Sequence, residues 1–297
     1  MGLEKFTKSG KIETNEQKTA LVFDMHNLIF RTVFIAHASD PTDLTFRAWK
    51  ILILQSINAA IRKFTPDRVI FVIDAESSWR KEHYAEYKEN RAELRKASPI
   101  NFEAFFPVMN KFIEDMKVMF SNSYFLRKNR VEGDDWIPVL TRDILPNWKV
   151  ITISADRDMY QCHKYPNYSQ YDPVKKKMIV CPNPKEYLLV KIIMGDLGDN
   201  IPAIKPRTGK VNAVKVLNDL TEELKNPISN KNFERNKLLI DFDCIPTDVL
   251  DLMKTTWNEY KTSEFRSRDL MKFLTDVGAG VLIENIHELI THFKPLI

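Results

Sequence analysis

Three apolar stretches of the sequence each lead into an aspartate, a placement that can bring carboxylates together. Asp24 ends LVFD, Asp74 ends FVID, and Asp156 comes two residues after ITIS. If the stretches are parallel strands, their carboxyl ends meet at one edge of an open sheet, where ligands bind in such folds. We therefore expect the three carboxylates to lie close together, which suits the binding of a cation.

Six further acids accompany these three. One follows Asp156 at an alternate position, VEGDD supplies three, and GDLGDNIPAI supplies two. The six are Asp158, Glu132, Asp134, Asp135, Asp196 and Asp199. Any one of them could be a helix cap, because acids favour helix N-termini. Nine carboxylates at one edge would repel one another unless cations neutralised them, so we interpret the set as metal ligands.

The ligand type narrows the choice of metal. Carboxylates without His or Cys select hard cations, Mg²⁺ or Mn²⁺. Nine acids exceed what one Mg²⁺ binds, so we predict two Mg²⁺ ions about 3.5 to 4 Å apart, for which Mn²⁺ can substitute. Such a pair promotes in-line attack of water on a phosphate ester. The cysteines and histidines show no zinc-binding spacing.

A basic stretch with interleaved aromatic residues follows the second apolar stretch. We expect WRKEHYAEYKENRAELRK, residues 79–96, to be a helix that overhangs the metal site. A solvated helix with Glu–Lys pairs is the alternative. Aromatic residues between cations are typical of platforms that stack on bases. The predicted contacts are Lys88 and Arg91 to the scissile phosphate, and Arg80, Tyr84 and Tyr87 to the rest of a nucleic acid.

The charge balance also favours a polyanionic substrate. The chain has 44 Lys and Arg against 40 Asp and Glu, a net charge of only +4. When the nine predicted ligands are set aside, 31 acids remain and the basic surplus is 13. A basic body around an acidic notch suits nucleic acid.

The elements that must position these residues alternate along the chain. The predicted strands are residues 20–24, 68–74, 124–127 and 148–154, with a hairpin that turns at Asp172-Pro173. The predicted helices are residues 44–64, 79–96, 102–120, 134–145 and 184–194. Loops and helices follow residue 204. This order predicts an α/β fold with a mainly parallel, doubly wound sheet and a helical C-terminal region.

Composition predicts the surroundings in which the protein works. No apolar run is long enough to span a bilayer, so we expect no membrane contact. Residues 1–18 are polar and lysine-rich, which predicts a flexible arm and no secretory signal. The three cysteines lie far apart, which indicates a reducing compartment and a cytoplasmic location. We expect a monomer.

Five motifs carry a resemblance to a known family. They are LVFDMHN, FVIDAESSWRKEHYAEYKENR, VEGDD, SADRDMYQ and GDLGDNIPAI. In this order they resemble the structure-specific 5′ nucleases, or flap endonucleases, and most of all the ribonuclease H branch of T-even-type bacteriophages. The likeness runs from about residue 19 to residue 245. It includes HKYPNYSQYDPVKKKMIV and LLIDFDCIP, which are similar to the phage branch.

The resemblance implies an organisation and an activity. It implies a PIN-like nuclease core at residues 19–194 with a basic arch at about 79–100, then a helix–three-turn–helix and a helical C-terminal region at 195–297. The implied enzyme is a two-Mg²⁺ 5′–3′ exonuclease and flap endonuclease that acts on DNA and RNA·DNA duplexes with 5′ ends or flaps. Such an enzyme removes RNA primers during phage replication in the host cytoplasm.

The resemblance also implies roles for the matched residues. It places Asp158, Asp196 and Asp199 at the second metal and the other six acids around the first, and Lys88 and Arg91 near the scissile phosphate. In the expected duplex-gripping element, Ala203 stands where a glycine is usual. Gly209 and Lys210 would offer an amide and a cation to a backbone phosphate. In the phage branch the C-terminal region is linked to the single-stranded DNA-binding protein, which is the partner expected here beyond about Thr247.

Other classes fit the strand-end acids alone. A phosphatase with an aspartyl nucleophile needs Asp-x-Asp after the first strand, but Asp24 is followed by Met25 and His26. A PIN-like ribonuclease lacks the basic arch and the helix–three-turn–helix. A non-catalytic nucleic-acid-binding relative would have lost several of the acids, and none of the matched set is missing.

Overall fold

A six-stranded sheet forms the centre of the protein. The structure is a computed structural model that describes residues 17–40, 46–205, 209–214 and 231–293. The strand order is β3-β2-β1-β4-β5-β6, with a parallel register throughout except at the antiparallel β5–β6 pair. The strands are β1 (Thr19–Asp24), β2 (Arg68–Val72), β3 (Tyr124–Leu126), β4 (Lys149–Ile153), β5 (Tyr168–Asp172) and β6 (Lys177–Ile179).

Alternate residues of the central strands enter two separate cores. Phe23 of β1 and Phe71 of β2 face one core, whereas Val22 and Val72 face the other. A strand that is buried on both faces needs a continuous apolar sequence, because successive side chains point to opposite sides. This requirement explains runs such as ALVF and VIFVI. Because the central strands are parallel, the acids that follow them reach the same edge of the sheet.

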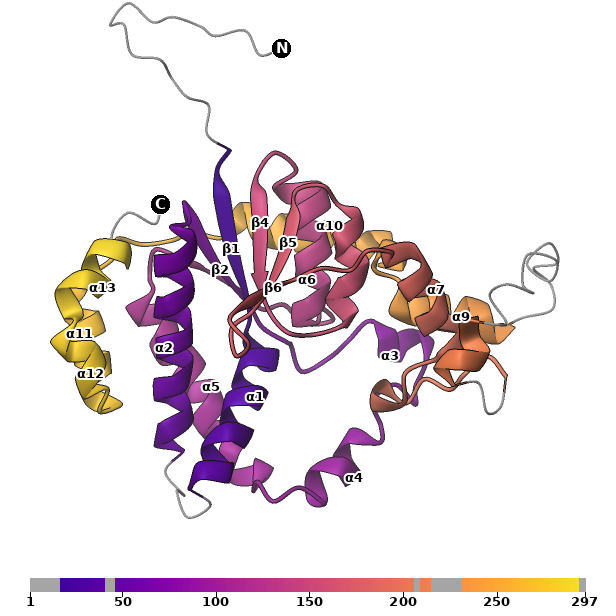
Figure 1. Ribbon diagram of the computed structural model, residues 1–297, viewed down its shortest axis with the longest axis horizontal. Helices are drawn as coiled ribbons and strands as arrows, with labels where there is room; N and C mark the ends of the chain where they lie inside the picture. Colours follow the sequence, from indigo (N-terminus) through magenta and orange to yellow (C-terminus); the bar gives the residue numbers. More distant parts are fainter. Residues whose placement is uncertain (1–16, 41–45, 206–208, 215–230, 294–297) are drawn as a thin grey trace, which may run out of the picture.

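Helices cover both faces of the sheet (Figure 1). On one face lie α1 (Met25–Ser39), α2 (Arg47–Phe64) and α5 (Phe102–Met119), joined by α11 (Ser267–Asp276), α12 (Gly280–Glu284) and α13 (Ile286–Phe293). On the other face lie α6 (Gly133–Val139), a π-helical turn (Leu140–Ile144), a 3₁₀ segment η2 (Asp158–Lys164), η5 (Phe242–Cys244) and α10 (Thr247–Glu259). None of the helices in the described ranges has the length and apolarity that crossing a bilayer requires.

A third, smaller core lies beside the sheet. It joins α7 (Pro184–Met194), α9 (Lys231–Ile240) and the segment that carries the 3₁₀ turn η3 (Leu197–Asp199), with Ile193, Ile201 and Ile240 buried between them. Tyr87 belongs to the same core. The third core therefore ties the region after α7 to the segment that follows β2.

The predicted α/β fold with a mainly parallel, doubly wound sheet is confirmed. The predicted strands and the hairpin at Asp172-Pro173 are present, and α2, α5 and α7 match predicted helices. The sequence prediction missed α1, which begins directly where β1 ends. Asp24 makes this junction possible, because its side chain caps α1 by accepting a hydrogen bond from the backbone N–H of Asn27 at 3.1 Å.

The prediction of one continuous helix over residues 79–96 is wrong. The segment contains two short helices, α3 (Arg80–His83) and α4 (Arg91–Lys96), with turns between them. The helix breaks at Tyr84, which is extended, and again at Lys88, whose φ is 58°. Both breaks serve contacts with the rest of the protein, which override local helix propensity: the backbone N–H of Lys88, for example, donates to the carbonyl of Asp199 at 2.9 Å.

The C-terminal part of the chain occupies two sides of the protein. α9 lies beside α7, whereas α11, α12 and α13 pack at the opposite end against α2 and α5 (Figure 1). Arg62 of α2 forms an ion pair with Glu288 of α13 at 2.8 Å. The predicted domain boundary at residue 194 stays a prediction. The predicted arm at 1–18 lies outside the described residues except for 17 and 18, and the predicted helix–three-turn–helix is described only at 195–205 and 209–214.

Candidate metal centre and nucleic-acid site

Asp24 ends β1, and Asp74 and Asp156 lie just beyond the carboxyl ends of the neighbouring strands β2 and β4. Besides capping α1, the Asp24 carboxylate accepts a hydrogen bond from the hydroxyl of Ser154 at 2.9 Å. Burial, with the nearby charges of Asp156 and Asp74, raises the pKa of Asp24 to about 7. A carboxyl group in this condition binds a cation readily, because the cation removes the repulsion and replaces the lost hydration.

A glycine holds the Asp74 carboxylate in place. The backbone N–H of Gly133 donates to Asp74 Oδ1 at 2.6 Å, and a Cβ at position 133 would lie only 2.9 Å from that same oxygen. His26 supports Asp74 from the other side, since its Nδ1 accepts from the Asp74 backbone N–H at 3.1 Å. Burial lowers the pKa of His26, so the ring stays neutral.

The VEGDD motif forms a second acidic group at the start of α6. Glu132, Asp134 and Asp135 each offer a carboxylate oxygen, and these oxygens lie within 4.8 Å of one another. Asp134 Oδ1 is buried with no hydrogen-bond partner among the described residues. Burial and the charges of its two neighbours raise the pKa of Asp134 well above its usual range. An unpartnered oxygen within an all-carboxylate group fits a hard divalent cation.

Arg80 fixes two members of this group. Its guanidinium donates to Glu132 Oε2 at 2.7 Å and to Asp135 Oδ1 at 2.7 Å, and Trp79 Nε1 donates to Asp135 Oδ2 at 3.0 Å. Arg80 is 2% exposed and Asp135 is fully buried. The pKa of Asp135 is raised by burial, which outweighs the charge of Arg80. Buried charges of this kind need such partners, because an unpaired one is costly.

Lys88 and Arg91 connect the VEGDD group to Asp199. Lys88 forms an ion pair with Glu132 and lies 3.9 Å from Asp199, whereas Arg91 Nη2 lies 2.6 Å from Asp199 Oδ1. The hydroxyl of Tyr87 lies within hydrogen-bond distance of both acids, at 2.9 Å and 3.1 Å. Burial opposes ionisation of Glu132, but the charges of Lys88 and Arg80 prevail and hold its pKa at about 2. The two cations thus lie at the rim of the acidic centre.

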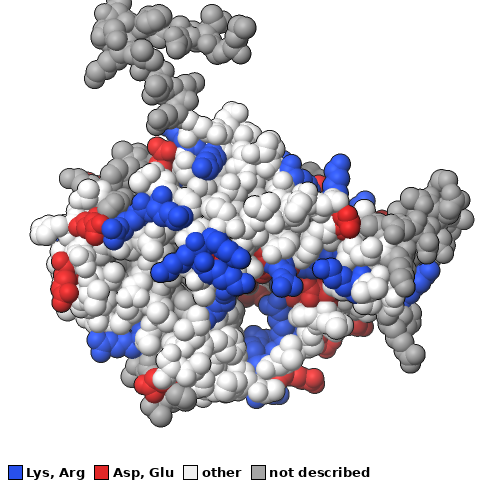
Figure 2. Space-filling model, in the orientation of Figure 1, with Lys and Arg blue, Asp and Glu red and all other residues white. Residues whose placement is uncertain are grey.

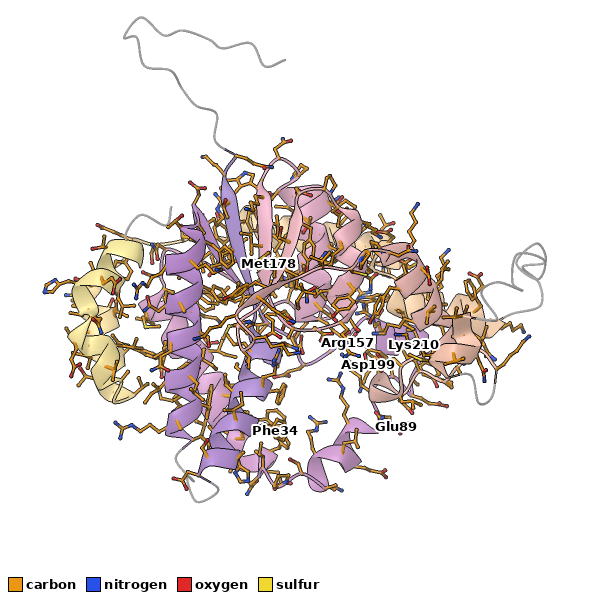
Figure 3. The ribbon with its side chains drawn as sticks, in the orientation of Figure 1. Phe34, Glu89, Arg157, Met178, Asp199 and Lys210 are labelled. Atoms are coloured by element: carbon orange, nitrogen blue, oxygen red, sulfur yellow. The ribbon has the colours of Figure 1, made fainter. Side chains whose placement is uncertain are left out.

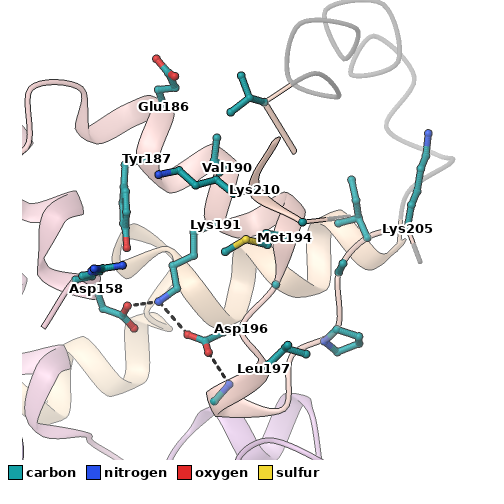
Figure 4. A pocket seen from close by; sticks show the side chains of 18 of the residues that line it. Asp158, Glu186, Tyr187, Val190, Lys191, Met194, Asp196, Leu197, Lys205 and Lys210 are labelled. Carbon is teal, nitrogen blue, oxygen red and sulfur yellow. Dashed lines mark hydrogen bonds and ion pairs between the residues drawn. The ribbon is translucent and has the colours of Figure 1, made fainter. Parts of the chain in front are cut away.

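Lys191 lies between the remaining two acids. Figure 4 shows its ammonium group between Asp158 and Asp196, with an ion pair to Asp158 and a 3.0 Å contact to Asp196 Oδ2. Lys191 is 8% exposed. Burial raises the pKa of Asp158 to about 6 although the lysine charge lowers it, and the lysine keeps the pKa of Asp196 below its usual range despite partial burial. A cavity of about 1320 Å³ opens beside this group.

The nine predicted ligands therefore form three linked groups along one edge of the sheet. Asp24 interacts with Asp74 and Asp156, Asp156 with Asp158, and Glu132 with Asp134 and Asp135. In the part of the chain that the structure describes, three ligand atoms come within 4.8 Å of one another only in the Glu132 group. The assignment of each acid to one of two metals stays a prediction.

Two of the predicted nucleic-acid contacts are buried. Arg80 and Tyr87 are each 2% exposed, because both side chains lie against carboxylates. Their contact with a nucleic acid stays a prediction. Tyr84 is half-buried beneath the guanidinium of Arg235, 5.2 Å from the ring centre. Gly209 and Lys210 are exposed on the wall of the cavity, and their contact with phosphate stays a prediction.

Sequence reasoning missed several residues that shape the centre. Lys191 was part of a predicted helix, yet its signal was visible: it is a cation in the apolar run LLVKIIM, five residues before Asp196. Ser154 and Trp79 carry no such signal, since a serine at a strand end or a tryptophan after a loop has many uses. Their hydrogen bonds to Asp24 and Asp135 follow only from the fold.

The described segment at 79–100 leaves an opening beside the acidic centre. Figure 2 shows this opening between the segment and the body of the protein, with basic side chains on its rim. Figure 3 places Asp199 and Arg157 on the body side of this opening and Glu89 on the segment 79–100 itself. Carboxylates that suit divalent cations, at the carboxyl edge of a parallel sheet and beside fixed cations, fit the class of metal-dependent enzymes that hydrolyse phosphate esters.

The comparisons with known proteins agree with this class. Residues 19–187 match the family described as 5′–3′ exonuclease, N-terminal resolvase-like domain, and the chain belongs to this family of nucleases. The ribonuclease H of Enterobacteria phage T4 is 29% identical over 262 residues, which cover 80% of this chain and 85% of that protein. A 5′–3′ exonuclease of Buchnera aphidicola is 23% identical, over 80% of each chain.

Solved structures share the fold. The flap endonuclease of bacteriophage T5, in a pseudo-enzyme–product complex with DNA and metal ions, has a TM-score of 0.63 at 21% identity and covers 82% of this chain and 98% of that chain. The T5 5′-exonuclease with bound zinc gives the same score, identity and share of this chain, and is covered over 99% of its own length. At this identity the likeness concerns the fold alone.

Proposed function

We propose that the protein is a Mg²⁺-dependent 5′–3′ exonuclease and flap endonuclease. Its substrates are DNA and RNA·DNA duplexes with 5′ ends or flaps, and its role is the removal of RNA primers during phage DNA replication. The proposal rests on one observation, that acids and cations are in contact at one edge of the sheet. Lys88 forms an ion pair with Glu132, and Arg91 forms one with Asp199. Hydrolysis of a phosphodiester uses both kinds of group, acids to hold metal ions and cations to bind the phosphate.

The acids would hold the metals. The first Mg²⁺ would take its donors from Asp24, Asp74, Glu132, Asp134 and Asp156, and the second from Asp158, Asp196 and Asp199, with Mn²⁺ as a substitute. When bound, two such ions polarise a phosphodiester and promote attack by water. Asp135 is engaged by Arg80 and Trp79, so we assign it the positioning of its neighbours.

The cations would hold the substrate. Because residues 79–96 do not form one helix, the side chains of Lys88 and Arg91 point toward the acidic centre, where each binds a carboxylate oxygen. A phosphate oxygen offers the same kind of acceptor, and an arginine binds it with a fork of two donors. We infer that these two side chains donate to the scissile phosphate and stabilise the charge that develops on it.

Cleavage of defined substrates tests the proposal. A labelled 5′-flap DNA duplex and a 5′-recessed RNA·DNA hybrid are incubated with the protein in Mg²⁺ or in EDTA. We expect cleavage in Mg²⁺ alone, and its loss in Asp156→Asn. Absence of cleavage with Mg²⁺ would refute the proposal and leave a non-catalytic binding protein. Full activity of the variant would refute the metal-dependent mechanism built on these acids.

A second comparison separates catalysis from binding. In Lys88→Ala with Arg91→Ala we expect cleavage to fall by about 10²-fold or more, as when oriented charge stabilisation is removed. Binding of the flap duplex in EDTA should change much less. Equal losses of binding and of cleavage would show that the pair serves affinity rather than the reaction.

The partner and the oligomeric state are part of the proposal. We propose that the protein acts as a monomer and that its C-terminal region binds a phage single-stranded DNA-binding protein. Val281, 63% exposed on α12, and Met271 on α11 offer apolar contacts on this region. Pull-down of the single-stranded DNA-binding protein of the same phage, with Val281→Asp as the comparison, tests the assignment.

A further inference from the structure

A polar cavity of about 500 Å³ lies beside the acidic centre, on the side away from residues 79–100. Its wall includes side chains from α1, the β5–β6 hairpin and the loop after β4. The residues that concern us are Asn27, Arg31, Arg157, Asp172, Lys175 and Lys177. None of them belongs to the predicted site.

The charges of this cavity are unbalanced. Arg31 lies 3.6 Å from the buried carboxylate of Asp172. Asp172 also accepts hydrogen bonds from the backbone N–H groups of Val174 and Lys175, at 2.9 and 3.0 Å, and so fixes the hairpin turn. Among the described residues, no ion pair is found for the exposed Arg157, Lys175 or Lys177. A hollow whose charged side chains are mainly cations concentrates anions.

The cavity adjoins the acidic centre, because residues that contact Asp24 or neighbour Asp156 in the chain line it. Asn27 donates its backbone N–H to Asp24, and its side-chain oxygen accepts from the backbone of Ala155, next to Asp156. Arg31 lies one helical turn beyond Asn27, on the same face of α1. Arg157 stands between Asp156 and Asp158 in the chain. Figure 2 shows basic side chains over the hairpin, where Figure 3 places Met178.

We propose that this cavity is a phosphate-binding subsite for the nucleic-acid strand, adjacent to the phosphate at the acidic centre. Two arginine forks and two lysines match the oxygens of a phosphate, and β5–β6 is the next part of the sheet beyond β4. A strand held at the acids by Lys88 and Arg91 on one side would then be held by this cavity on the other. This inference rests on the proposed function, since it names where that substrate continues.

The salt dependence of binding tests the subsite. Lys175→Gln with Lys177→Gln removes two cations of the cavity, and Lys176→Gln with Lys185→Gln removes two exposed lysines outside it. Both doubles carry the same net charge. Anisotropy titrations in EDTA, over a salt series, give the slope of log K against log[salt] for a flap duplex. We expect the slope to shrink by about 0.7 to 0.9 in the cavity double, which is the value for one phosphate, and to stay near the wild-type value in the control.

Neutral phosphates locate the contact. An uncharged methylphosphonate replaces one phosphate of the flap duplex at a time, at positions around the cleavage point. Binding of a duplex with a 5′-phosphate is also compared with binding of one with a 5′-hydroxyl. We expect wild-type binding to weaken at one or two positions, and the cavity double to lose that sensitivity. Sensitivity at an internal position indicates a backbone phosphate, and sensitivity to the 5′ end indicates a terminal phosphate; both support the subsite.

Two results would overturn the subsite. One is an equal slope change in the two doubles, which would reduce the effect to net charge. The other is an unchanged pattern of methylphosphonate sensitivity in the cavity double. Cleavage by the wild-type protein in Mg²⁺ is measured separately, so failure of the proposed nuclease activity is distinguishable from failure of this subsite. Thermal unfolding checks that the exposed substitutions leave the fold intact.

Discussion

Lys191→Met is the substitution that most directly tests how Asp158 and Asp196 are held together without metal. Methionine keeps most of the volume of the side chain but removes the charge between Asp158 and Asp196. Removal of one partner from a fully buried ion pair costs about 3 to 5 kcal/mol, because the other charge stays buried and uncompensated. Lys191 is 8% exposed, but the side chains of Asp158 and Asp196 are 30% and 26% exposed, so water screens part of the charge that remains. We therefore expect the free energy of unfolding in EDTA to fall by about 1 to 3 kcal/mol at pH 8.

A divalent cation should reverse this loss. The two carboxylates that remain can bind Mg²⁺ without first displacing an ammonium group, so the variant should gain more stability from the metal than the wild type does. A ligand at 100 times its dissociation constant adds about 2.7 kcal/mol to stability. At pH 5 the loss in EDTA should also be smaller, because burial raises the pKa of Asp158 to about 6 and the carboxyl is then protonated.

Urea unfolding followed by tryptophan fluorescence, with EDTA and with a Mg²⁺ series, measures both effects. Lys185→Met is the matched control, since Lys185 is exposed in the first turn of the same helix and should change stability by less than about 0.5 kcal/mol. Wild-type stability of Lys191→Met in EDTA would refute the reasoning. So would an equal gain from Mg²⁺ in the wild type and the variant, because the lysine would then not compete with the metal.

Three further predictions follow from the acidic centre. In EDTA, Asp24 has a pKa of about 7 in the folded protein and 3.8 in the unfolded chain. The folded state therefore binds more protons between these pH values, and it loses about 4 kcal/mol of stability as pH rises through them. Asp24→Asn should flatten the pH dependence of the urea-unfolding free energy in this range, and an unchanged pH dependence would contradict the argument. Gly133→Ala places a Cβ 2.9 Å from Asp74 Oδ1, so cleavage should fall by about 10²-fold; a fully active variant rules this out. Asp135→Asn leaves Arg80 partly unpaired and should cost about 3 to 5 kcal/mol in urea unfolding, whereas a loss below 1 kcal/mol would show that Arg80 finds other partners.

The strands and their terminal acids were predictable because both follow from local rules. A strand buried on both faces needs an apolar run, and parallel strands end at one edge, so Asp24, Asp74 and Asp156 had to approach one another. α1 was not predicted, because no turn separates it from β1 and Asp24 serves both elements. A residue that ends a strand and caps a helix leaves no boundary signal in the sequence.

The broken segment after β2 and the position of Lys191 depend on distant contacts. Nothing near Lys88 in the sequence shows that its backbone adopts a φ of 58° to reach Asp199, more than a hundred residues away. The Tyr87 side chain likewise turns inward to meet Glu132 and Asp199. Helical periodicity over 79–96 was real as a local pattern, but a network of buried charges determined the conformation.

The opening in Figure 2 is enclosed by unbroken polypeptide, because residues 79–100 run from β2 at one end to α5 at the other. Hydrogen bonds also fasten this loop to η3, from Asn90 Nδ2 to the Leu197 carbonyl at 2.7 Å and from Asn200 Nδ2 to the Glu86 carbonyl at 2.8 Å. Any linear polymer inside such a ring is linked to it topologically. If the proposed substrate occupies this opening, its strand must enter by a free end, and a covalently closed circle cannot enter. Such a strand would stay associated until it slides off an end.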